Sequence, residues 1–78
     1  MDIKYEKMVV QNIKTLRNIK GITQEQLAIK LQVNGCDITR STIAKMEVGQ
    51  RHIYIDELKS IKEILNIPFD ELFVWKIA

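Results

Sequence analysis

One helix-start pattern occurs twice in this chain, and it constrains the possible folds more than any other feature. Each copy places a threonine between two apolar residues: Ile22, Thr23 and Leu27 in the first, and Ile38, Thr39 and Ile43 in the second. A threonine cap flanked by apolar residues at these positions is typical of a helix N-terminus, where the two apolar side chains pack together. Gln26 completes a capping box with Thr23. The sequence therefore predicts two short helices that begin near residues 23 and 39.

The other helix boundaries are marked by three glycines and one proline. A first helix is predicted over about 6–19 from three apolar residues at helical spacing, Val9, Ile13 and Leu16. The helices that begin near 23 and 39 are expected to end near residues 33 and 48, because Asn34-Gly35 and Gly49 favour turns. A fourth helix is predicted over about 55–66, and Pro68 opens a last short helical turn. We therefore expect an all-α fold with five helices.

The length of 78 residues allows one compact core, and we expect a single domain over residues 1–78. Such a chain has no room for a catalytic cleft between lobes or for a separate sensor domain. No apolar run approaches about 18 residues, and the first residues lack the apolar stretch of a signal peptide, so we expect a cytoplasmic protein without a membrane span. One cysteine, Cys36, and one histidine, His52, are too few for an internal disulfide or a zinc site.

The charge of the chain is unevenly distributed. Residues 1–54 contain nine Lys/Arg against five Asp/Glu, whereas residues 55–78 contain three against five. A basic first part is typical of a domain that presents one face to a polyanion. On charge alone, ordinary solvated helix surface is the better interpretation.

Three segments in order, IKTLRNIKGITQEQLAIKL, ITRSTIAKMEVGQR and LKSIKEILNIPFDELF, resemble the Cro/repressor-type helix-turn-helix family, also called the XRE family. The resemblance covers about residues 9–73 and places the helix-turn-helix at about 23–48. It implies a compact, five-helix, lambda-repressor-like domain that binds duplex DNA and regulates transcription. The turn between the second and third helices departs from the family, because it is about five residues longer. We expect the extra residues, 33–37, to loop outward at the edge of the DNA face.

The resemblance implies a set of DNA-binding residues at the second and third helices and just after them: Gln24, Thr39, Arg40, Ser41, Thr42, Lys45 and Arg51. Gln24 is expected to bond a phosphate at the start of the second helix. Arg40 and Lys45 have the side chains that read guanine in the major groove. Arg51 is expected at a backbone phosphate, with the neighbouring His52 as a weaker candidate. The alternative for every member is a solvated surface residue, and for Thr39 a cap and nothing more.

The resemblance also implies that Arg17 and Glu47 form an ion pair that fixes the third helix against the first. Two independent surface charges are the alternative. The role of Trp75, with Phe69 and Phe73, is left open between completion of the core and a self-association surface. A redox or metal role for Cys36 is the less favoured interpretation of that residue.

We interpret the chain as a sequence-specific regulator that occupies a palindromic operator as a homodimer, most simply as a repressor, without a cofactor. The alternative is an antitoxin or a protein-interaction adaptor with the same fold. No set of nucleophile, base and orienting residue is visible, and there is no phosphate-binding glycine loop, so we do not expect an enzyme.

Overall fold

The computed structural model of the chain describes residues 3–75, so the ends of the predicted 1–78 domain lie outside the described residues. The described part contains four α-helices, α1 (Ile3–Ile19), α2 (Gln24–Val33), α3 (Arg40–Glu47) and α4 (Ile55–Leu65), followed by a 3₁₀ helix, η1 (Phe69–Phe73). It contains no strand, so the all-α prediction is confirmed. None of its helices is long and apolar enough to cross a membrane.

The predicted count of five helices is not confirmed, because the fifth segment is not an α-helix. η1 has five residues and begins after Pro68. The tighter 3₁₀ geometry is typical of short helical segments such as this one. The α1 helix also begins earlier than the predicted residue 6, since Ile3 already belongs to it.

Both predicted helix starts are confirmed by their hydrogen bonds. Thr23 Oγ1 accepts a hydrogen bond from the Gln26 amide at 3.0 Å, and Gln26 Oε1 accepts one from the Thr23 amide at 2.9 Å. Thr39 Oγ1 accepts a longer bond, 3.3 Å, from the Thr42 amide. These bonds satisfy amides that a helix leaves without partners at its N-terminus, and they start α2 at Gln24 and α3 at Arg40.

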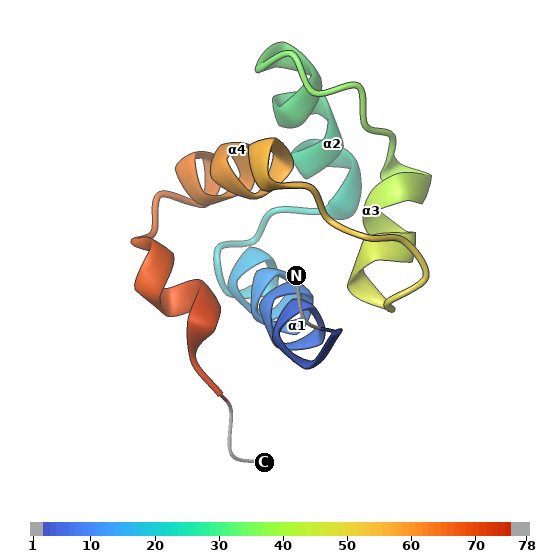
Figure 1. Cartoon of the computed structure of the whole chain (residues 1–78). Coiled ribbons are helices and arrows are strands. Elements are labelled where there is room, and N and C mark those ends of the chain that lie inside the picture. Colours follow the sequence, from blue (N-terminus) through green and yellow to red (C-terminus); the bar gives the residue numbers. More distant parts are fainter. Residues whose placement is uncertain (1–2, 76–78) are drawn as a thin grey trace.

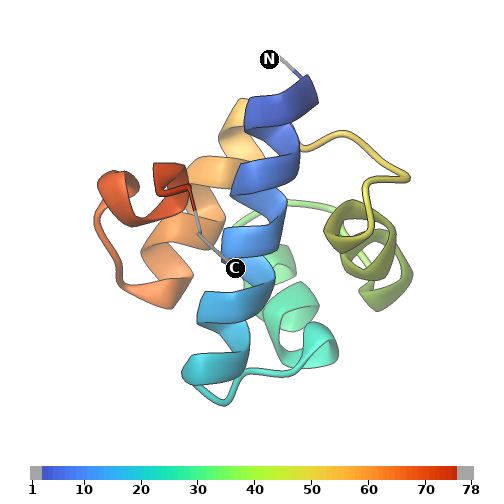
Figure 2. The same cartoon turned by 90° about the horizontal axis from the view of Figure 1, so that it is seen from below.

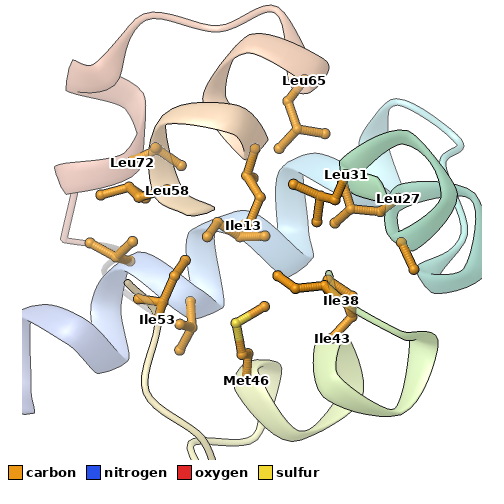
Figure 3. Close-up of a cluster of buried hydrophobic side chains, with 14 of the residues drawn as sticks. Ile13, Leu27, Leu31, Ile38, Ile43, Met46, Ile53, Leu58, Leu65 and Leu72 are labelled. Atoms are coloured by element: carbon orange, nitrogen blue, oxygen red, sulfur yellow. The ribbon is translucent and has the colours of Figure 1, made fainter. Parts of the chain in front are cut away.

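The helices enclose one apolar core, around which α1 packs against α3, α4 and η1. Figure 1 shows α1 almost along its axis, with α2 and α4 above it and α3 to one side. In Figure 2, α3 and α4 lie on opposite sides of α1, so α3 turns one side away from the rest of the protein. Figure 3 shows the side chains that meet in the core, among them Ile13, Leu27, Leu31, Ile43, Met46 and Leu65, all of which are buried.

A buried asparagine holds η1 against α1. Asn12 Nδ2 donates hydrogen bonds to the backbone oxygens of Leu72, at 2.9 Å, and Val74, at 2.8 Å. Leu72 completes the core, whereas Phe69, Phe73 and Trp75 remain exposed. These three aromatic residues therefore do not complete the core, and that interpretation of them is wrong.

Candidate nucleic-acid interface

The outward side of α3 presents three of the predicted DNA-binding side chains. Arg40, Ser41 and Lys45 are exposed, and within residues 3–75 no hydrogen bond or ion pair engages the side chain of any of them. The opposite side of the same helix buries Ile43 and Met46 in the core. The helix thus offers a guanidinium, a hydroxyl and an ammonium group to an external acceptor.

The two threonines of the predicted set already have internal partners. Thr39 caps α3, and its hydroxyl lies 3.1 Å from that of the half-buried Thr42. The capping role of Thr39 is therefore present in the structure, and a contact of either hydroxyl with DNA stays a prediction.

An open groove brings the start of α2 and the start of α3 together. It is lined by Arg17, Asn18, Gly21, Ile22, Thr23, Gln24, Glu25 and Arg40. The first amides of α2 and the positive end of its dipole favour an anion here, and Arg40 adds a cation from the other side. Glu25 is the one acidic residue in this lining, and it lies in the first turn of α2. The groove joins two predicted DNA-binding residues, Gln24 and Arg40, in one place.

A buried ion pair sets the orientation of α3. Arg17 Nε lies 2.8 Å from Glu47 Oε2, and Arg17 Nη2 lies 3.0 Å from Glu47 Oε1. The two side chains are only 8% and 3% exposed. Arg17 Nη1 also donates to the backbone oxygen of Ile22 at 2.9 Å. This network ties α3 to α1 and to the connection between α1 and α2, as the resemblance implies.

Gln24 belongs to the same network. Its Nε2 donates to Glu47 Oε1 at 2.9 Å, and the residue is half-buried. One N–H of the amide is therefore used inside the protein, which leaves the other as the donor for the predicted phosphate contact. This link could not be predicted from the sequence, because the spacing of Gln24 and Glu47 follows no periodicity that would reveal it.

A sequence profile of the helix-turn-helix family matches residues 13–72. The chain belongs to the helix-turn-helix family. It is also 36% identical over 62 residues to the HTH-type transcriptional activator BcrR of Enterococcus faecalis. That alignment covers 80% of this chain and 28% of the longer relative. No solved structure matches the chain significantly.

The basic residue that follows the helix-turn-helix is held by an acidic residue of α4. Arg51 forms a two-bond ion pair with the buried Glu57, in which Arg51 Nη2 lies 2.9 Å from Glu57 Oε2. The guanidinium of Arg51 also lies over the ring of Tyr54. The hydrogen bonds to Glu57 raise the pKa of Arg51, although its burial acts in the opposite direction. The predicted phosphate contact of Arg51 is untested, but this cation has an internal counter-charge that Lys45 lacks.

His52, the weaker candidate, bonds to α1. Its Nδ1 lies 2.8 Å from Glu6 Oε1, and the Ile53 amide donates to Glu6 Oε2 at 3.0 Å. Burial of the Glu6 carboxyl disfavours its charged form, but the hydrogen bonds from His52 and Ile53 outweigh this effect and lower the pKa of Glu6. The role of Glu6 could not be predicted from the sequence, since Glu6 meets His52 and Ile53 only through the tertiary fold.

The long turn of this helix-turn-helix is exposed at its tip and anchored at one residue. Val33 is 82% exposed, and Asn34, Gly35 and Asp37 are also exposed. Cys36 instead packs against the core, and its Sγ lies 3.5 Å from Ser60 Oγ of α4. The prediction that residues 33–37 all loop outward is therefore wrong at Cys36, because its apolar side chain is half-buried against the core.

We expect Cys36→Ala to lower the free energy of unfolding by about 1 kcal/mol, because it removes a packed sulfur from the edge of the core. Val33→Ala removes more apolar atoms from the exposed last residue of α2 and is the matched control, with an expected change within about 0.5 kcal/mol. Urea denaturation of both variants measures the difference. An equal effect of the two substitutions would show that the turn has no anchor at Cys36.

Proposed function

We propose that this helix-turn-helix domain binds duplex DNA sequence-specifically as a homodimer and represses transcription by occupying its operator. The observation that carries the proposal is the outward side of α3, where Arg40, Ser41 and Lys45 are exposed without internal partners. In helix-turn-helix proteins this second helix enters the major groove, where arginine and lysine bond guanine O6 and N7. The proposed action needs neither catalysis nor a cofactor.

A pair of domains related by a two-fold axis explains how so small a reading surface gains specificity. Two copies of α3 would read two half-sites about 34–36 Å apart, so the operator is expected to be palindromic. The name of the Enterococcus faecalis relative supports a role in transcription and specifies activation for that longer protein. We propose repression for this chain, since a bound dimer excludes other proteins from the DNA that it covers.

Selection of bound sequences from a pool of random duplex DNA tests the proposal. The expected result is an enriched palindrome with half-sites centred about 10 base pairs apart. The selected site is then placed across the promoter of a reporter gene, where expression of the protein is expected to lower transcription. Activation would overturn the repressor assignment, and an asymmetric half-site would overturn the dimer. Failure to enrich any duplex without a protein partner would favour the antitoxin or adaptor alternative.

We expect Arg40→Ala to weaken binding of the selected site by about 1–3 kcal/mol and to relax the preference at one or two base pairs. The reason is that a bidentate arginine contact discriminates between bases, whereas a phosphate contact does not. Lys59→Ala, on the exposed side of α4, is the control and is expected to leave affinity and preference unchanged. Affinity measured for the selected site and for its single-base variants decides the matter. An equal loss of affinity for all sequences would show that Arg40 does not read a base.

A further inference from the structure

The connection between α3 and α4 is held from two sides by carboxylates. We call residues 48–54 the exit loop. From α4, Glu57 binds Arg51 and accepts a hydrogen bond from the Tyr54 amide at 2.9 Å. From α1, Glu6 uses one oxygen for His52 and the other for the amide of Ile53. The exit loop is thus fixed both to α4, which follows it directly, and to α1, whose Glu6 lies 46 residues before His52 in sequence.

On the α1 side, the exit loop depends on the hydrogen bonds of Glu6, because side chains do not fill the space between the loop and α1. A cavity of about 260 Å³ lies between α1 and the exit loop, and Glu6, Val10, Met46 and His52 are among its lining residues. The Glu6 side chain is only 13% exposed at the edge of this cavity. A half-buried carboxylate whose two oxygens both take part in hydrogen bonds is a strong local link, because charge-assisted bonds exceed neutral ones in strength.

The exit loop directly follows the end of α3 and lies next to the outward-facing side of that helix (Figures 1 and 2). We propose that Glu6 is a positioning residue for DNA binding, because it holds His52 and the Ile53 amide and so sets the exit loop in the conformation that meets the DNA backbone. This inference rests on the proposed function. Since backbone contacts carry no sequence information, loss of Glu6 weakens binding to all sequences alike.

The test compares Glu6→Ala with Glu63→Ala, which removes a surface carboxylate of α4 from a loose pair with Lys59. Hydrogen exchange of the Ile53 amide is measured in the free protein, and affinity is measured for the selected duplex and for an unrelated duplex at low salt. Glu6→Ala is expected to speed Ile53 exchange about tenfold or more, because it removes a bond to a charged group. It is also expected to weaken binding to both duplexes by a similar factor, about five- to tenfold. A loss of this size does not exceed what a hydrogen bond to a charged group contributes. Glu63→Ala changes neither quantity.

Two further variants keep the test decisive if Glu6→Ala folds poorly. Glu6→Gln keeps one acceptor for the Ile53 amide and is expected to recover part of the affinity. His52→Ala removes only an exposed ring. If Glu6 acts partly through that ring, Glu6→Gln should cost less affinity in the His52→Ala background than in the wild type.

Three results would overturn the positioning role. The first is faster Ile53 exchange with unchanged affinity, which would show that Glu6 anchors the loop but that the loop does not affect DNA binding. The second is unchanged Ile53 exchange in Glu6→Ala. The third is a loss of affinity for the selected duplex alone, which would show that Glu6 affects base reading by α3. If the wild type binds neither duplex, the proposed function fails and the positioning role with it, while the exchange data still report whether Glu6 anchors the loop.

Discussion

Glu47→Ala is expected to lower the free energy of unfolding by about 3–5 kcal/mol, because it leaves the buried Arg17 guanidinium without its counter-charge. Arg17 has bonds to Glu47 at 2.8 and 3.0 Å and one to the Ile22 oxygen, so the substitution removes most of its partners at once. Gln24 loses its acceptor in the same variant. A loss of this size is a large part of the total stability of a domain this small, and urea denaturation measures it directly.

A double-mutant cycle separates the ion pair from general damage to the core. Arg17→Ala is expected to cost nearly as much as Glu47→Ala, and the double variant much less than the sum, because neither charge is then buried alone. An apolar replacement of the pair, Arg17→Met with Glu47→Leu, is expected to recover still more stability. Glu63→Ala is the control, since its pair with Lys59 spans 3.7 Å on the surface and contributes little. Additive single losses would show that Arg17 and Glu47 do not interact in solution.

The starts of α2 and α3 were predictable from sequence because their determinants are local. A threonine cap and its apolar neighbours lie within a few residues of each other, and the hydrogen bonds of Thr23 and Thr39 are the ones that the pattern requires. The Arg17–Glu47 pair could be predicted only through the family resemblance, since nothing in the spacing of the two residues brings them together. The exposed side of α3 followed from both sources, because Ile43 and Met46 define the buried side.

The missed residues share a different property, which is that their partners are backbone groups or charges far along the chain. Asn12 bonds the oxygens of Leu72 and Val74, and Glu6 bonds the amide of Ile53. Backbone groups leave no trace in the sequence, so no residue type marks these contacts. Arg51 shows a different difficulty, because its partner Glu57 is only six residues away, but no regular helical or strand spacing relates a loop residue to a residue of the next helix.

The affinity for the selected duplex is expected to fall about a thousandfold when the salt concentration rises from 50 to 200 mM. If a dimer neutralises roughly six phosphates, the logarithm of the association constant falls with the logarithm of salt at a slope of about −5, because bound cations release counterions from DNA. Titrations at four or five salt concentrations give the slope. Lys59→Ala is the control and should leave it unchanged. A flat response of the wild type would contradict binding to duplex DNA.

The individual cations are expected to contribute unequally to this slope. Lys45 is exposed without an internal counter-charge, so Lys45→Ala should reduce the magnitude of the slope by about 2 in a dimer, because each subunit then brings one cation fewer to the DNA. Arg51→Ala should reduce it by less, because Glu57 already neutralises the guanidinium and a phosphate would have to displace that carboxylate. Equal reductions in the two variants would show that Arg51 leaves Glu57 for a phosphate when DNA binds, and that the ion pair of the free protein is exchanged for a contact with the DNA backbone.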